Sequence, residues 1–115
     1  MDIAKTSDIT VSVGLDPQGV PARITWNASD ALGTPATQES KAILLAFFDA
    51  DTRDTLKIDL WTKEMMVEEM DKFMYQTLRG LADTYYKATQ NTELANQMQQ
   101  FIQHFGEVTK VIAKK

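Results

Sequence analysis

Three aspartates lie close together in the middle of the chain, at Asp49, Asp51 and Asp54. Carboxylates at the first and third positions of a loop are typical calcium ligands. The pattern then departs from a calcium loop, because Arg53 occupies the fifth position and Leu60 stands where a bidentate glutamate is needed. We therefore interpret this segment as a polar turn.

A second group of ionisable residues comprises Glu68, Glu69 and Asp71, and His104 is the one histidine of the chain. Paired carboxylates can act as general acid and base when burial separates their pKa values. The sequence places none of them in a pocket, and no cysteine or second histidine completes a transition-metal site with His104. We expect no enzyme, no metal site and no cofactor. A hydrolase that uses Glu68 or Glu69 with His104 is the enzymatic alternative.

Length and composition predict one soluble globular domain over residues 1–115, with 43% hydrophobic and 24% charged residues. A formal net charge of −4 argues against nucleic-acid binding, which needs a cationic surface. The longest apolar run, Ala42 to Phe48, is far too short to span a bilayer. The first residues lack the apolar core of a signal peptide. We expect a cytoplasmic protein that does not insert into membranes.

Period-two alternation of apolar and polar residues marks two strands near the start of the chain, at residues 7–15 and 20–26. The segment Asp16–Gly19 between them has the proline and glycine of a tight turn, which predicts an antiparallel hairpin. We expect residues 1–6 to be flexible. Residues 27–37 neither alternate nor follow helical spacing, so we expect a loop there.

A second pair of strands follows. Residues 41–49 are continuously apolar in the middle, which is typical of a buried strand or of a short buried helix, and the length favours the strand. Residues 55–61 alternate again. A second hairpin is the simplest interpretation, so the two hairpins predict a four-stranded antiparallel sheet.

After Trp61 the apolar spacing changes to three, four and seven residues, which predicts a long amphipathic helix. Thr62 is suited to be its N-cap, with Glu64 in the first turn. A second amphipathic helix is predicted to follow Asn91-Thr92 and to end near Ala113. Both apolar stripes need cover, so we expect an α+β fold with the two C-terminal helices packed on one face of the sheet.

Four large apolar side chains are candidates for a partner surface: Trp26, Trp61, Met66 and Met70. Each tryptophan ends a strand, where an indole can serve as a lid on the core or as a binding platform. Methionine adapts to varied partners and is also ordinary core filler. Both interpretations remain open for these residues.

Residues spread over most of the chain carry a family resemblance: Lys5-Thr6-Ser7, Ile24-Thr25-Trp26, Ser40-Lys41-Ala42, the run from Ile58 to Lys63, then Met65, Val67, Glu69, Met70, Phe73, Gln76, Thr77, Leu78, Ala82, Asp83 and Thr84. In these residues the chain resembles the gliding motility protein GldC family of the Bacteroidetes. The run from Ile58 to Lys63 is the most specific of them. The likeness extends over nearly the whole chain.

The resemblance implies a small accessory protein of the gliding machinery, without enzymatic activity, that supports envelope-associated components such as the lipoprotein GldB. It supplies no catalytic or binding residues. We therefore expect a non-enzymatic adaptor that acts by protein–protein contact, and a homodimer is compatible with it. The alternative is a small-ligand or lipid carrier, with a pocket between helices and sheet lined by Phe47, Trp61, Met70 and Phe73.

Overall fold

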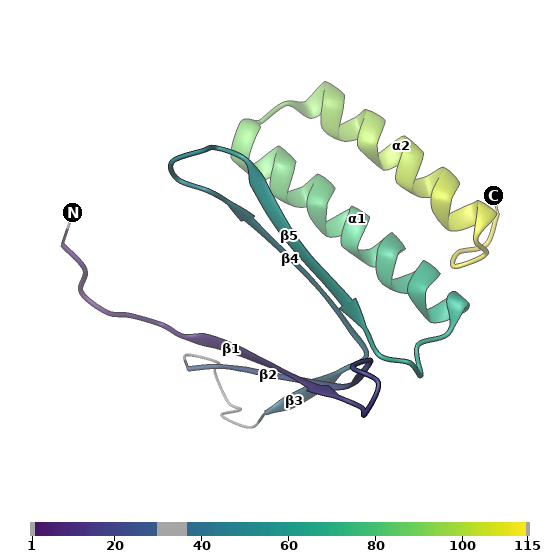
Figure 1. Ribbon diagram of the computed structural model, residues 1–115. Helices are drawn as coiled ribbons and strands as arrows, with labels where there is room; N and C mark the ends of the chain where they lie inside the picture. The colour runs from purple at the N-terminus through teal and green to yellow at the C-terminus, as the bar shows by residue number, and fades with distance from the viewer. Residues whose placement is uncertain (1, 30–36, 115) are drawn as a thin grey trace. The chain divides into compact units, whose positions relative to one another are not determined.

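The computed structural model describes residues 2–29 and 37–114, which form five strands followed by two helices (Figure 1). They divide into two compact units, Met1–Met65 with all of these strands and Met66–Lys115 with both helices. The predicted α+β class is confirmed. Packing of the helices on a sheet, and a single domain over residues 1–115, stay predictions.

The first sheet contains β1 (Ile9–Leu15), β2 (Pro21–Ala28) and β3 (Gln38–Ser40), all antiparallel, with β2 in the centre. The turn between β1 and β2 has Gly19 at a φ of 80°, a left-handed conformation that glycine adopts without steric cost. The carbonyl of Asp16 accepts the Gly19 N–H at 2.9 Å. The predicted first hairpin is confirmed.

Two details of this sheet differ from the prediction. Asn27 and Ala28, expected in a loop, belong to β2 and pair with β1. The strand β3 was not expected, because three residues are too few to show a period. Residues 30–36 of the predicted loop lie outside the described residues.

The second sheet is a hairpin of β4 (Ala42–Phe48) and β5 (Thr55–Trp61), so the second predicted hairpin is confirmed. The prediction of one four-stranded sheet is wrong, because the described strands form a three-stranded and a two-stranded sheet. Lys41 alone separates β3 from β4, and the chain bends there. The bend lets consecutive strands enter different sheets. One face of the hairpin is wholly apolar, with Ile43, Leu45, Phe47, Leu56, Ile58 and Leu60.

The two sheets meet where β5 ends. The N–H of Thr62 donates to the carbonyl of Lys41 at 2.8 Å, and the N–H of Lys63 donates to the carbonyl of Pro21 at 3.1 Å. Thr62 is buried, and Ile24 of β2 is fully buried. Thr62 and Lys63 therefore connect the β4–β5 hairpin to the residue that follows the turn between β1 and β2.

The second unit is an antiparallel pair of helices, α1 (Val67–Thr89) and α2 (Thr92–Val108), which lie side by side in Figure 1. Tyr75, Ala82 and Ile102 form its buried core. Partly buried side chains packed against that core are Leu78, Met98, Phe105, Val111 and Ile112. None of the described helices is long and apolar enough to cross a membrane.

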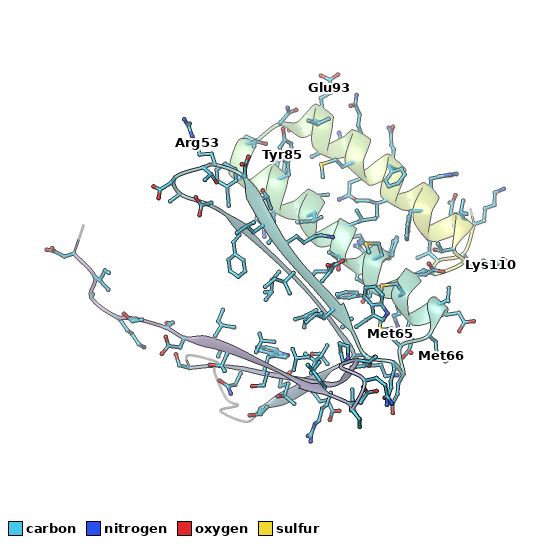
Figure 2. All side chains as sticks on the ribbon, in the orientation of Figure 1. Arg53, Met65, Met66, Tyr85, Glu93 and Lys110 are labelled. Carbon is cyan, nitrogen blue, oxygen red and sulfur yellow. The ribbon has the colours of Figure 1, made fainter. Side chains whose placement is uncertain are left out.

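The start of α1 was predicted wrongly. Thr62 is not its N-cap and Glu64 is not in its first turn, because the helix begins at Val67 after Met66. The N–H of Met66, labelled in Figure 2, donates to Oε1 of Glu69 at 3.0 Å. Glu68 and Glu69 both lie in the first turn, where negative charge stabilises the helix dipole.

The helix α2 begins where the sequence predicts and ends earlier. Oδ1 of Asn91, its N-cap, accepts the N–H of Leu94 at 3.0 Å. The helix ends at Val108 instead of near Ala113. Lys110 has a φ of 65°, which reverses the chain, and the N–H of Ile112 donates back to the carbonyl of Gly106 at 3.2 Å.

Candidate functional site

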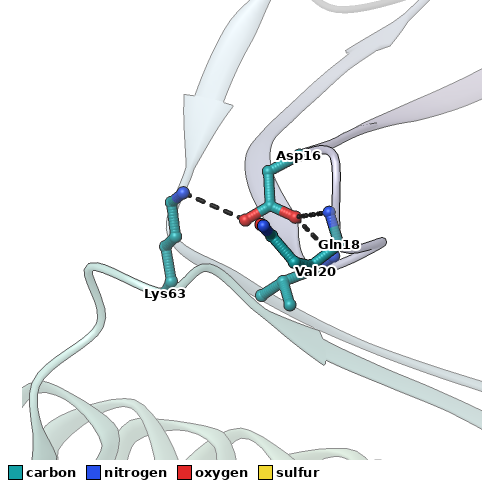
Figure 3. Close-up of polar contacts among 4 residues, drawn as sticks. All are labelled: Asp16, Gln18, Val20 and Lys63. Carbon is teal, nitrogen blue, oxygen red and sulfur yellow. Dashed lines mark hydrogen bonds and ion pairs between the residues drawn. The ribbon is translucent and has the colours of Figure 1, made fainter.

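A compact polar network ties the first turn to the residue that follows β5 by two places (Figure 3). Nζ of Lys63 donates to Oδ2 of Asp16 at 3.0 Å. Oδ1 of the same carboxylate accepts the N–H groups of Gln18 at 2.9 Å and Val20 at 3.0 Å. The Asp16 side chain is only 10% exposed. The Val20 N–H and the Lys63 ammonium stabilise the carboxylate, which lowers the pKa of Asp16.

A shallow cleft of about 250 Å³ lies beside this network, and we name it the Trp61 cleft. Its lining consists of Val20, Pro21, Asp59, Leu60 and Trp61. The Trp61 side chain is 52% exposed. An accessible indole beside apolar side chains, with one carboxylate at the rim, is typical of the anchors that dominate protein–protein interfaces.

The four residues predicted as a partner surface fall in different units. Trp61 lines the cleft, and Trp26 lies in β2, partly buried. Met66 is 59% exposed before α1, and Met70 is partly buried in that helix. A single surface made of all four therefore stays a prediction.

Sequence reasoning missed the rest of the cleft lining. Val20 and Pro21 follow the first turn, whereas Asp59 and Leu60 end β5 about 40 residues later. The Asp16–Lys63 ion pair brings the two segments together. The opposite charges of Asp16 and Lys63 are a sequence signal for this contact, but the sequence alone does not say which charges pair.

The aspartates that resemble a calcium loop form the turn between β4 and β5. Oδ2 of Asp49 accepts the N–H groups of Asp51 at 3.1 Å and Thr52 at 2.9 Å. These bonds, from Thr52 foremost, lower the pKa of Asp49. Arg53, at a φ of 59°, points outward at the tip of the hairpin (Figure 2). The predicted polar turn is confirmed.

The other ionisable candidates are dispersed. Glu68 and Glu69 lie at the start of α1, whereas His104 is exposed on α2. Over residues 2–29 and 37–114, no three His, Cys, Asp or Glu side chains are grouped so that they could hold a metal ion.

A second hollow, of about 310 Å³, lies in the seam between α1 and α2. Its lining is almost wholly apolar: Leu78, Leu81, Leu94, Gln97, Met98, Phe101 and Ile102. The pocket predicted for a carrier is a different one, because Phe47 and Trp61 belong to the first unit and Met70 and Phe73 to the second. That pocket stays a prediction.

Comparison with known protein families decides the relationship of this chain. The family model described as gliding motility-associated protein GldC-like matches residues 21–111. The chain belongs to the GldC-like family. The match begins at the first residue of β2 and includes both helices and most of the Trp61 cleft. No curated protein and no solved structure gives a significant match.

The family assignment confirms the resemblance seen in the sequence. Membership implies that the chain is involved in gliding motility. The GldC-like family is not a known enzyme family. Its description assigns no role to individual residues, so any site in the chain has to be argued from geometry.

Proposed function

We propose that this protein is a non-enzymatic, cytoplasmic adaptor of the gliding motility machinery and that it acts by protein–protein contact. Its partner is an envelope-associated motility component, for which the lipoprotein GldB is the first candidate. Family membership supports the process. The Trp61 cleft supports the mode of action.

The observation that carries the proposal is the exposed indole of Trp61 in a shallow cleft that two separate segments of the chain line. The cleft combines the exit of the first turn with the end of β5, and the Asp16–Lys63 ion pair fixes both. A pre-organised cleft loses little conformational entropy when a partner binds. Aromatic anchors in such clefts contribute most of the binding energy of an interface.

The test is crosslinking in living cells of the native host, followed by affinity purification of the tagged chain and mass spectrometry. We expect motility or secretion components to be enriched over an untagged control. Trp61→Ala should lose them, since it removes the indole. Phe101→Ala is the matched control, because Phe101 is a similarly exposed aromatic residue on α2, at 55% exposure against 52%.

Recovery of no motility component with the native chain would contradict the adaptor role. Equal recovery with native protein and Trp61→Ala would keep the adaptor and remove the cleft as its binding surface. Loss with Phe101→Ala alone would move the binding surface to the helical unit.

A small-ligand or lipid carrier is the second candidate function. The apolar hollow in the seam between α1 and α2 favours it, because about 310 Å³ is at the lower end of ligand pocket volumes. Native mass spectrometry of protein purified from its own host separates the two functions. A carrier retains a ligand, whereas an adaptor is recovered without any bound small molecule, as monomer or as dimer.

A further inference from the structure

The strand β1 is an open edge of the first sheet. It pairs with β2 along one side over all seven of its residues, and it has no strand on its other side among the described residues. An extended segment precedes it (Figure 1). Proteins protect such edges with lysine, proline or inward-pointing charge. Ile9–Leu15 contains none of these, and the one irregularity in its pairing lies at its end, between Gly14 and Leu15, so the edge from Ile9 to Gly14 is available for pairing.

The hydrogen bonds to β2 show which backbone groups are available. The carbonyl of Asp8 accepts the N–H of Ser29 at 2.9 Å, so Asp8 faces β2. Backbone groups alternate along an antiparallel strand, and Thr10 and Ser12 therefore face β2 as well. The N–H and C=O groups of Ile9, Val11 and Val13 face away from the sheet.

The apolar side chains of β1 form a pattern that is symmetric about Ser12. Val11 and Val13 flank it, Thr10 and Gly14 come next, and Ile9 and Leu15 lie at the ends. When two copies of such a strand pair antiparallel about a two-fold axis at Ser12, Ile9 lies opposite Leu15 and Val11 opposite Val13. Apolar residues thus meet apolar residues on one face of the strand, while Thr10 lies opposite Gly14 and Ser12 opposite Ser12 on the other face.

From this symmetry we propose that two copies of this chain pair through β1, antiparallel and centred on Ser12, and so join their three-stranded sheets into one continuous sheet. The inference does not depend on the proposed adaptor function. The outward N–H and C=O groups of each copy become partners for those of the other. A contact that uses one patch on both partners is the usual way in which homodimers form.

Exposure at the two ends of β1 supports this pairing. Ile9 is 73% exposed and Leu15 is 61% exposed, although both are large apolar residues on one face of the strand. In the proposed register each covers the other across the two-fold axis. Asp8 then lies opposite Asp16 of the second copy, and the ion pair of Asp16 with Lys63 reduces the repulsion between them.

The opposite edge of the sheet is less suited to pairing. The strand β3 is only three residues long, and its central residue is Glu39. An ion pair of 3.7 Å joins Glu39 to Arg23 of β2. A short strand that carries charge is a protected edge. A second copy of this chain is therefore expected at β1.

Cysteine crosslinking tests the register, because the chain has no cysteine of its own. Ser12→Cys places the two thiols directly opposite each other, so mild oxidation should give a covalent dimer. Thr10→Cys is the matched control on the same face of β1. Two such thiols would lie about 13 Å apart along the strands, too far for a disulfide.

Sedimentation velocity tests the association itself. Native protein should sediment as a species with twice the 13.0 kDa mass of the chain. Ser12→Lys puts like charges on the two-fold axis and should raise the dissociation constant of the dimer by about tenfold or more. Gln38→Lys adds the same charge to β3 and should leave the dimer unchanged.

Three results would overturn the proposal. One is a native protein that stays monomeric up to about 100 µM. Another is a dimer that Ser12→Lys leaves intact while circular dichroism shows that the variant folds. The third is oxidation of Thr10→Cys as fast as that of Ser12→Cys, and this comparison holds even if the lysine variant fails to fold.

Discussion

Tyr75 of α1 packs against Gly106 of α2 so closely that a methyl group on Gly106 has no room. A Cβ at that position would lie 2.6 Å from Cε1 of Tyr75 and 2.8 Å from Cγ1 of Ile112. Tyr75 is buried in the core of the helical unit. The absence of a side chain at Gly106 is thus what allows the helices and the C-terminal turn to meet there.

Gly106→Ala should therefore destabilise the protein, although glycine to alanine normally stabilises a helix interior by about 1 kcal/mol. Crowding in a packed core costs about 1–3 kcal/mol. We expect the free energy of unfolding to fall. Urea denaturation followed by circular dichroism measures it. Gly80→Ala is the control, because a Cβ there meets no described atom within 4 Å and should raise stability. Equal effects of the two changes would contradict the packing.

Asn91→Ala should lower the free energy of unfolding by about 0.5–2 kcal/mol, because it removes the side-chain acceptor for the first turn of α2. Asn91→Asp retains the acceptor and should stay close to the native value. Asn96→Ala, at an exposed position within the same helix, is the control for loss of an amide. Chemical denaturation measures all three, and similar losses at both asparagines would exclude a capping role.

Gln90→Gly should stabilise the protein by about 1 kcal/mol. Gln90 ends α1 with a φ of 59° and a ψ of 21°, a left-handed conformation that favours glycine. Lys87→Gly, one turn earlier in the helix, should destabilise by a similar amount. Thermal unfolding of the two variants should therefore shift in opposite directions. A shift in the same direction would contradict the left-handed cap.

Acid should weaken the part of the stability that Asp16 supplies. The pKa of Asp16 is lowered in the folded state, so its contribution is present above the ordinary value of 3.8 and is lost as pH falls through the folded pKa. Asp16→Asn lacks this contribution. The difference in melting temperature between native protein and Asp16→Asn should hence shrink below pH 3.8. A difference that stays constant over the acid range would contradict the lowered pKa.

Lys63→Met tests how far the Lys63 ammonium, the second cause after the Val20 N–H, lowers the pKa of Asp16. The variant removes the ammonium 3.0 Å from Asp16 and leaves the backbone donors of Val20 and Gln18. We expect a smaller acid dependence than in native protein, but not its complete loss. The measurement is the same series of melting curves. An acid dependence equal to that of native protein would show that the backbone donors alone stabilise the carboxylate.

The hairpins and the start of α2 could be predicted because short-range chemistry decides them. Asp16 and Gly19 supply the acceptor and the left-handed residue of a turn, and Asn91 supplies a cap. Thr62 has the same local qualifications for a cap. Thr62 is instead buried and bonded to Lys41, which is a tertiary effect, and α1 begins at Val67.

The division into two sheets and the Trp61 cleft could not be predicted for a related reason. A bend at Lys41 separates β3 from β4, and neither a proline nor a glycine marks it. The cleft depends on an ion pair between residues 47 positions apart. Periodicity finds the elements, but it does not say which ends of them meet.

The short length of β3 limits how far the three-stranded sheet can grow by pairing with further copies. A sheet with two long open edges can add copies at both, and such growth ends in a fibre. Here one edge has seven residues and the other has three. Once the longer edge of this three-stranded sheet is occupied by a symmetric contact, its other edge is the short, charged strand β3. The same short strand that shows no period in the sequence thereby makes further pairing at that edge of the three-stranded sheet unfavourable.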